Sequence, residues 1–448
     1  MSGTGISSAP SPAPSPAYRA ASRSGGGGGG PAAVPLRWVW LAAWPITAVF
    51  VLSNAATPLY VLWQRDIGFS KGTLTVVFAC YIVGLIGSLL VSGVLSDRIG
   101  RRPVLLPALG LALVACLVFG TAGSVAALIV ARLFTGVAVG AVVSAGMAAV
   151  TDVAGPERRR TAALLASCAM VFGAGLGPLL AGLLSELAPG PTATVFGVEA
   201  VLLALAVLAV LRMPLPLPRP WNARDDQDAR DDRDDDGHGG GRGDWVRVPG
   251  VPSGRGRQLA LGVAVFAPGI TATSFVLSLG PSLLSGLLGT TSRIVAGSMA
   301  FAMFLTATGV QFAVQRLRRR TVLALGAAGT ALSMLALAAA VRSGSAAALL
   351  AAALLAGAGQ GLGQLGGLSL LNSTVPPRRL AEANAALNVG GYVPAGLLPV
   401  SAGYLSDAAG LTTGATVFAA VLAVLAALGG LLVLTAPRRT TDPDSSDA

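Results

Sequence analysis

The 448-residue sequence is poor in charge, in histidine and in cysteine. Charged residues make up only 11% of the chain, and aromatic residues 5%. The single histidine, His238, follows an acidic run at Asp225 to Asp236. These acids are consecutive rather than spaced for one metal geometry, so a solvated linker explains them better than a metal site. Without another histidine, no serine–histidine pair or Cys/His zinc cluster can form in the apolar part of the chain, and we expect no enzyme activity.

Cysteine and nucleotide-binding patterns narrow the class further. Cys80, Cys116 and Cys168 all lie inside apolar runs, so no disulfide framework is predicted. The phosphate-binding pattern G-x-x-x-x-G-K-[ST] is absent, so ATP-driven transport would need a separate subunit. We therefore expect neither a cofactor nor a metal.

Long apolar runs are what the chain has in excess. Hydrophobic residues make up 53% of the sequence, and the mean hydropathy is +0.72. Nearly every apolar run reaches about 18 residues or more, enough to cross a hydrocarbon core of roughly 30 Å. The sequence thus predicts an all-α, polytopic membrane protein with twelve transmembrane helices. They are predicted at 38–63, 73–95, 103–122, 125–148, 161–187, 193–212, 258–281, 294–315, 321–341, 345–371, 381–406 and 412–436.

Basic residues are distributed unevenly among the predicted loops. One set of alternate loops receives most of them, whereas the opposite set receives only Arg65, Lys71, Arg293 and Arg342. Basic loops stay in the cytoplasm, so this bias predicts a multi-pass protein of the cytoplasmic (plasma) membrane with both termini cytoplasmic. Arginines placed in turns also favour the lipid bilayer, rather than nucleic acid, as the partner.

Composition divides the chain into five segments. Residues 1–36, rich in Ser, Pro, Ala and Gly, are predicted to be a disordered cytoplasmic tail rather than a signal peptide. Residues 37–213 form an N-terminal six-helix bundle, and 214–257 a polar, mixed-charge cytoplasmic linker. Residues 258–437 form a C-terminal six-helix bundle, and 438–448 a second cytoplasmic tail.

The two bundles are predicted to be copies of one unit. A shift of 221 residues aligns P-L-L-A-G-L-L-S-E, from Pro178 to Glu186, with P-V-S-A-G-Y-L-S-D, from Pro399 to Asp407. The same shift brings the spaced residues L-x-x-G-x-x-x-G of Leu133 to Gly140 onto those of Leu354 to Gly361. Because each unit holds an even number of helices, we expect a parallel repeat about an axis along the membrane normal, with a cavity between the halves.

A charged decapeptide, G-V-L-S-D-R-I-G-R-R, separates the second and third predicted helices. Gly93 would allow a neighbouring helix to approach closely. Asp97 is an acceptor suited to the N-terminus of a facing helix or to a nearby arginine. The alternative is that Arg101 and Arg102 merely anchor the turn at the cytoplasmic surface.

This decapeptide resembles the loop two-three signature of the major facilitator superfamily, G-x-L-a-D-r-x-G-r-[RK]. The matching residues are Gly93, Asp97, Arg98, Gly100, Arg101 and Arg102. The run A-R-L-F-T-G-V-A-V-G, from Ala131 to Gly140, resembles the helix-four motif R-x-x-x-G-x-x-x-G of the same family. The resemblance implies that Asp97 pins the turn against the start of helix eleven and closes the cytoplasmic side.

A third match concerns helix five. The run G-A-G-L-G-P-L-L-A-G is similar to G-x-x-x-G-P-x-x-G-G, the motif associated with proton-linked drug and metabolite exporters, with Ala181 in place of one glycine. Its matching residues are Gly173, Gly177, Pro178 and Gly182. Residues of these types predict a kink and a close-packing face. Glycine packing without a directional role is the alternative.

Two ionisable residues at membrane depth are candidates for proton coupling. Arg132 lies in helix four, where an isolated guanidinium costs at least about 2.5 to 3.5 kcal/mol. Its repeat counterpart is Ala353, and a structural partner for a helix-end carbonyl or carboxylate is the alternative role. Glu199 in helix six could carry the proton, since apolar surroundings disfavour a charged carboxylate; the alternative places it in the external water layer.

Uncharged polar residues are the candidates for a substrate cavity. They are Asn54, Thr57, Gln311, Gln360, Gln364, Asn384, Asn388 and Tyr392. Hydrogen bonding between helices is the alternative role of each. A cavity lined mainly by small apolar residues and a few amides would suit a neutral or amphipathic organic molecule.

The sequence and the resemblance together predict a secondary transporter that works by alternating access. The expected activity is export of a small hydrophobic or amphipathic compound by proton antiport, by a monomer. An importer on the same fold and a non-transporting membrane sensor remain the alternatives.

Overall fold

The computed structural model describes residues 35–214, 250–251, 255–287, 289, 291–376 and 379–437. The terminal tails and the linker predicted from the sequence lie almost wholly outside these residues. Within this part of the chain the secondary structure is helical, and no strand occurs.

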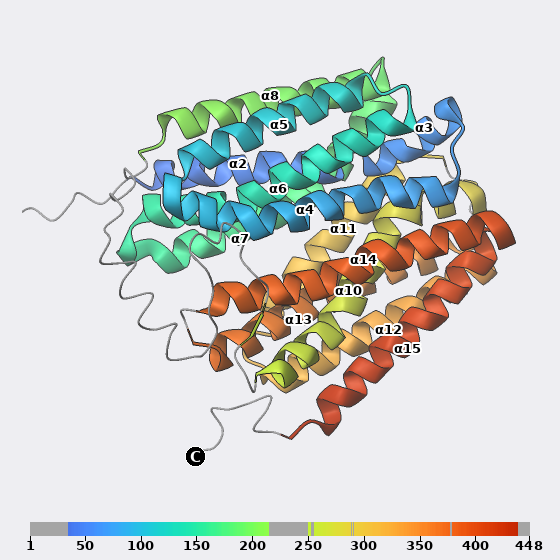
Figure 1. Cartoon of the computed structure of the whole chain (residues 1–448). Helices are drawn as coiled ribbons and strands as arrows, with labels where there is room; N and C mark the ends of the chain where they lie inside the picture. Colours follow the sequence, from blue (N-terminus) through green and yellow to red (C-terminus); the bar gives the residue numbers. More distant parts are fainter. Residues whose placement is uncertain are drawn as a thin grey trace, which may run out of the picture. The chain divides into compact units, whose positions relative to one another are not determined.

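Twelve long helical segments are present among the described residues, six in each half (Figure 1). The first half holds α2 (Leu36–Ala55) with η1 (Thr57–Leu59) and α3 (Tyr60–Ile67), α4 (Lys71–Ile99), α5 (Arg102–Gly120), α6 (Val125–Ala154), η2 (Pro156–Arg158) with α7 (Arg159–Leu187), and α8 (Pro191–Arg212). The second half holds α10 (Gly256–Leu287), α11 (Arg293–Ala313), α12 (Arg319–Ser343), α13 (Ala346–Thr374), α14 (Leu380–Ala409) and α15 (Leu411–Thr435). The predicted order of helices is therefore confirmed.

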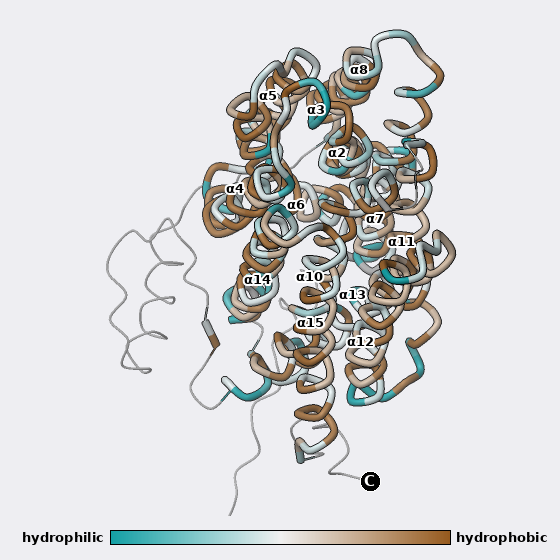
Figure 2. The backbone as a smooth tube through the Cα atoms, turned by 90° about the vertical axis from the view of Figure 1, so that its right-hand side faces the viewer, coloured by the Kyte–Doolittle hydropathy of each residue, from teal (hydrophilic) through white to brown (hydrophobic). Residues whose placement is uncertain are grey.

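Length and composition identify these helices as membrane-spanning. Counting α2 to α3 as one span, eleven described helices are long and apolar enough to cross a bilayer. The twelfth, α14, has 30 residues, but Glu382, Asn384 and Asn388 dilute its apolar character. Leucines such as Leu117 and Leu397 expose 68% and 64% of their surface, and Figure 2 shows apolar stretches along most of the labelled helices. Side chains of this type on the perimeter suit contact with lipid.

The first span is not the continuous helix that the sequence predicts over 38–63. Helix α2 ends at Ala55, a 3₁₀ turn covers Thr57–Leu59, and α3 continues from Tyr60. Pro58 lies in this turn and lacks the N–H that a continuous helix would use at that position. The break exposes the carbonyl groups of the last turn of α2 to partners from other helices.

Glycines bring pairs of helices into backbone contact within each half. On α6, an added methyl group at Gly136 would collide with the carbonyl oxygen of Tyr81 on α4. In the second half, Gly357 and Gly361 on α13 meet the carbonyl oxygens of Met303 and Ala307 on α11 in the same way. The aligned glycines of the repeat therefore have the same structural role.

The two halves meet mainly along two helix pairs. Helix α4 packs on α14, and α7 packs on α11 (Figure 1). We call the end that carries the Asp97 to Arg102 turn the inner end, which the arginine distribution predicts to be cytoplasmic. The outer end carries the starts of α4 and α11.

Substitution of Gly136 tests the close contact of α4 and α6. Gly136→Ala should lower the Tm of the detergent-solubilised protein by several degrees, because overpacking against a backbone costs about 1 to 3 kcal/mol. Gly110→Ala is the matched control, since an added Cβ at this helical position of α5 meets nothing within 4 Å. Its Tm should stay the same or rise slightly, because alanine is the better helix former. Equal Tm values for the two variants would contradict the packing role.

Candidate functional site

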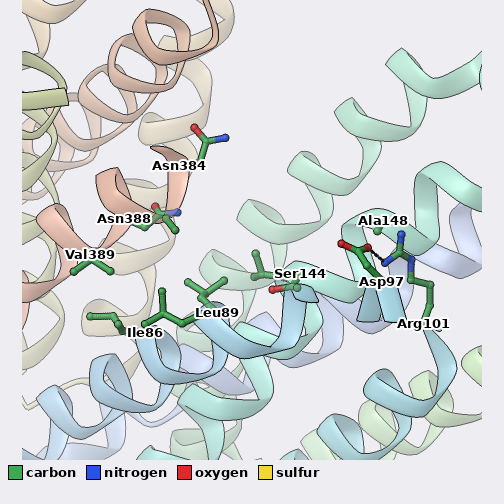
Figure 3. Close-up of a pocket in the computed structure, with 13 residues that line it drawn as sticks. Ile86, Leu89, Asp97, Arg101, Ser144, Ala148, Asn384, Asn388 and Val389 are labelled. Atoms are coloured by element: carbon green, nitrogen blue, oxygen red, sulfur yellow. Dashed lines mark hydrogen bonds and ion pairs between the residues drawn. The ribbon is translucent and has the colours of Figure 1, made fainter. Parts of the chain in front are cut away.

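A cavity of about 440 Å³ lies between the halves toward the inner end. Helices α4 and α6 supply one wall and α14 supplies the other (Figure 3). The apolar lining residues are Ile86, Leu89, Leu90, Val143, Ala148, Ala385 and Val389, with Gly93 beside them. Ser144, Asn384 and Asn388 supply polar groups, and Asp97 and Arg101 lie at one end. A volume of this size is typical of sites for small organic molecules.

Arg101 organises the charged turn beside this cavity. Its Nη1 donates to Asp97 Oδ1 at 2.5 Å and to Ser96 Oγ at 2.8 Å, and its Nε donates to Asp152 Oδ2 at 3.0 Å. Burial of part of the Arg101 side chain lowers its pKa, whereas the hydrogen bonds to Asp97 and Asp152 together raise it more. The pKa of this guanidinium therefore lies above its ordinary value. The turn is therefore held by an arginine between two carboxylates.

The other residues of the turn have separate local roles. Gly100 ends α4 with φ of 96°, a conformation that favours glycine, and its N–H bonds Ser96 O at 3.1 Å. Arg102 Nη2 donates to the carbonyl oxygen of Met213 at 2.5 Å, which ties the start of α5 to the end of α8. Gly93 lines the cavity, and Arg98 is half-buried at the end of α4.

Asp97 and the start of α14 lie on opposite sides of the cavity. The Asp97 side chain is 57% exposed and points toward Arg101, while Asn384 and Asn388 lie across the space (Figure 3). The structure therefore represents a state that is open at the inner end. The predicted latch between Asp97 and helix eleven concerns the closed state and stays a prediction.

Arg132 is buried in the first half, at 1% exposure. Its Nη1 donates to the carbonyl oxygen of Ser53, in the last turn of α2, at 2.6 Å. The guanidinium also lies 5.1 Å from the centroid of the Tyr60 ring and 5.7 Å from that of Phe119. Nε and Nη2 have no hydrogen-bond partner among the described residues. Arg132 thus has the helix-end carbonyl partner that the alternative, structural role predicts. Two of its nitrogen atoms, Nε and Nη2, stay without such a partner among the described residues.

Glu199 is buried as well, at 2% exposure, in the packing of the first half. This burial rules out the alternative that places it in the external water layer. Its Oε2 has no hydrogen-bond partner among the described residues. The rings of Phe119 and Phe196 are stacked with their centroids 4.9 Å apart, and the Arg132 guanidinium lies over the Phe119 ring. Glu199 does not line the cavity described above.

The helix-five motif has two packing faces. Gly173 and Gly177 face α2, where a methyl group would meet the carbonyl oxygens of Thr47 and Val51. Gly182 instead faces the Arg293 carbonyl of α11, and the Pro178 carbonyl lies against Gly297 of the same helix. The motif therefore joins the first half internally and also forms part of its contact with the second.

Of the predicted substrate residues, the cavity brings together Asn384 and Asn388. Thr57 is 2% exposed, and Asn54 Nδ2 donates to Ser53 Oγ at 3.0 Å. Gln360 packs against Gly269 of α10, and the Tyr392 ring meets Phe266 edge-on with centroids 6.4 Å apart. Gln311 and Gln364 are half-buried outside this lining.

Two polar residues of the site were missed by the sequence interpretation. Ser144 lines the cavity, and its Oγ donates to Gly140 O at 2.9 Å. Asp152 anchors Arg101 from the end of α6. Asp152 could have been noticed as one of the few acids near an arginine-rich turn, whereas a serine in a run of small residues carries no such signal.

Thiol labelling tests whether the cavity opens at the inner end. With Cys80, Cys116 and Cys168 replaced by alanine, we expect Asn388→Cys and Ser144→Cys to react with a membrane-impermeant maleimide in inside-out vesicles. Thr57→Cys, at a buried position, is the control and should stay unreactive. Faster labelling of the cavity positions in right-side-out vesicles would contradict both the open end and the predicted orientation.

Comparison with known proteins places this geometry in a family. The family model of the Major Facilitator Superfamily matches residues 39–313 and 259–448. The 3-(3-hydroxy-phenyl)propionate transporter of Escherichia coli (strain K12) is 36% identical over 104 residues, 23% of this chain and 26% of that protein. The cephamycin export protein CmcT of Amycolatopsis lactamdurans is 33% identical over 164 residues, 35% of this chain and 32% of that protein. The matches thus span about a quarter to a third of these relatives.

A solved structure supports the fold over most of the chain. It is a bacterial homologue of the human lysosomal transporter Spinster, inward-facing and unoccupied, with a TM-score of 0.70 and 16% identity. The match covers 94% of this chain and 100% of that one. Twelve described helices in two repeated halves, a cavity between them and the family match lead to one conclusion: this chain belongs to the major facilitator superfamily of membrane transporters.

Proposed function

We propose that this transporter exports a small hydrophobic or amphipathic organic compound in exchange for protons, by alternating access. The observation that carries the proposal is the cavity of about 440 Å³ between the two halves. Rocking of one half on the other would close this cavity at the inner end and open it at the outer end. We further propose that the chain works as a monomer in the cytoplasmic membrane with both termini cytoplasmic.

The chemistry of the cavity supports a neutral or amphipathic substrate. Its walls are mostly apolar, with the amides of Asn384 and Asn388 on one side and the Ser144 hydroxyl on the other. Among the described lining residues Asp97 is the only carboxylate, and it is paired with Arg101 at 2.5 Å. A paired carboxylate offers little to an organic cation, whereas the amides can bind a hydroxyl, carbonyl or carboxyl group.

Two observations favour export. The helix-five motif, which resembles that of proton-linked exporters, packs on the second half through Gly182 and Pro178. A relative that matches 35% of the chain is named a cephamycin export protein. The motif lies where the two halves meet, at the contact that must change when one half rocks on the other.

Proton coupling is proposed for Glu199 and Arg132. Both are buried in the first half, and both have polar atoms without partners among the described residues. An unpartnered polar atom in an apolar environment is costly, which favours a group that exchanges a proton or changes partners during the cycle. The Ser53 carbonyl is the partner that Arg132 holds in the present state.

Everted vesicles test the proposed exchange. The substrate is first found by a growth screen of a strain that carries the chain against a toxic-compound panel, including cephamycin and 3-(3-hydroxyphenyl)propionate. Addition of that substrate to inside-out vesicles should dissipate a preformed pH gradient, and vesicles lacking the chain should show no change. Transport that persists with a protonophore would contradict antiport. If cells that carry the chain instead accumulate the compound and become more sensitive to it, the transporter would be an importer.

Neutralising the buried carboxyl tests its part in coupling. Glu199→Gln should abolish proton-driven transport but retain substrate exchange across the membrane without a gradient, because only the proton carrier is lost. Glu157→Gln, an exposed acid in the η2 turn, is the matched control and should transport normally. Full gradient-driven transport by Glu199→Gln, at an unchanged Tm, would remove Glu199 from the coupling mechanism.

A further inference from the structure

We infer that Glu186 and Asp407 form two matched carboxylate latches that hold the outer ends of the two halves together while the inner end is open. Each carboxylate belongs to one half and binds the first backbone N–H groups of a helix in the other half. The inference deepens the alternating-access transport proposed above and rests on it. We call the two contacts the outer latches.

The first latch joins α14 to α4. Asp407 lies in the last turn of α14, and its Oδ1 accepts a hydrogen bond from the Lys71 N–H at 3.0 Å. Its Oδ2 accepts a second from the Gly72 N–H at 2.8 Å. These N–H groups belong to the first two residues of α4 and have no acceptor within their own helix. A carboxylate there meets both free donors and the positive end of the helix dipole.

The second latch joins α7 to α11. Here the first half supplies the carboxylate and the second half supplies the N–H groups. Glu186 lies at the end of α7, and its Oε1 accepts hydrogen bonds from the N–H groups of Arg293 and, at 3.2 Å, of Ile294. Arg293 and Ile294 are the first two residues of α11. Glu186 aligns with Asp407 in the sequence repeat, so one device occurs twice about the pseudo-two-fold axis.

The surroundings of the latches are also repeated. Ser70 caps α4 by accepting from the Thr73 N–H at 3.1 Å, and Ser292 caps α11 by accepting from the Val295 N–H at 3.3 Å. One turn before each carboxylate, a glycine lets the helices touch: Gly403 lies against the Lys71 carbonyl.

Gly182 lies against the Arg293 carbonyl in the same way. Serine, basic residue, glycine and acid therefore recur at equivalent places across the interface. Such agreement between two separately encoded contacts is evidence for a shared role.

The position of the latches assigns them to one state of the cycle. Helices α4 and α14 touch at the outer end, through Gly72, Tyr404 and Asp407, but the cavity separates them near Asp97 and Asn384. Opening of the outer end would have to withdraw Asp407 from α4 and Glu186 from α11. Because both carboxylates are exposed, water would replace the hydrogen bonds that are lost on opening. The latches therefore shift the equilibrium toward the state open at the inner end and do not prevent the other state.

Distances between spin labels test the latches without any substrate. In a background without native cysteines, one label pair at Thr121 and Ser343 reports on the outer end, and another at Glu157 and Gln315 on the inner end. The double variant Glu186→Gln/Asp407→Asn should raise the outward-open fraction about tenfold, equivalent to about 1.4 kcal/mol. Outer label distances should lengthen and inner ones shorten. Each single variant should give part of this shift.

Two further variants separate the latches from general charge effects. Asp66→Asn removes an exposed acid at the same outer end, from α3, and should leave both distance distributions unchanged. Glu186→Asp/Asp407→Glu keeps both charges, and its distance distributions should be close to those of the unmodified protein. Unchanged distances in the folded Glu186→Gln/Asp407→Asn protein, or an equal shift in Asp66→Asn, would overturn the inference. Because no substrate is used, failure of the export proposal leaves this result interpretable.

Discussion

Backbone contact between helices is the constraint on which the rest of this structure depends. In a bilayer the lipid chains are as apolar as leucine, so helices associate through close packing rather than through a hydrophobic driving force. Gly136 on α6 and Gly357 on α13 place helix backbones against each other in the two halves. These contacts hold the helices of each half together. Gly182 meets the Arg293 carbonyl in the same way at the interface between the halves. The cavity, the charged turn and the outer latches all lie along that interface.

The two ends of the interface are built differently. At the inner end, the carboxylate of Asp97 occurs in the first half only, because its counterpart in the repeat is Gln315. At the outer end the acid is kept in both copies, as Glu186 and Asp407, and both make the same contacts. The predicted contact of Asp97 at the inner end would therefore have a single copy, whereas the outer latches have two. We therefore expect the state that is open at the inner end to be held by more contacts than the state that is closed there.

Much of the fold could be predicted from the sequence, because membrane helices are encoded by length and composition. The repeat, its glycines and the charged turn were predicted as well. The cavity could not be, since Ser144 and Asn384 face it only because α4 and α14 separate at one end, which depends on the conformational state. The buried position of Glu199 was also beyond the sequence, because it depends on how α8 is rotated against α5.

The break in the first span shows how one residue can distinguish two copies of a fold. The first span holds Pro45 and Pro58, and α10 holds Pro268 and Pro281 at the same spacing, so we take Pro281 as the counterpart of Pro58. Yet α10 continues as a helix through Pro281, whereas the first span breaks around Pro58. The copies differ in the helix that packs nearby: Arg132 stands on α6, where α13 has Ala353. Arg132 binds the carbonyl oxygen of Ser53 beside the break, which satisfies an acceptor that alanine could not reach. We therefore attribute the break to the guanidinium together with the proline, and the same group links the end of α2 to the buried aromatic rings of Tyr60 and Phe119.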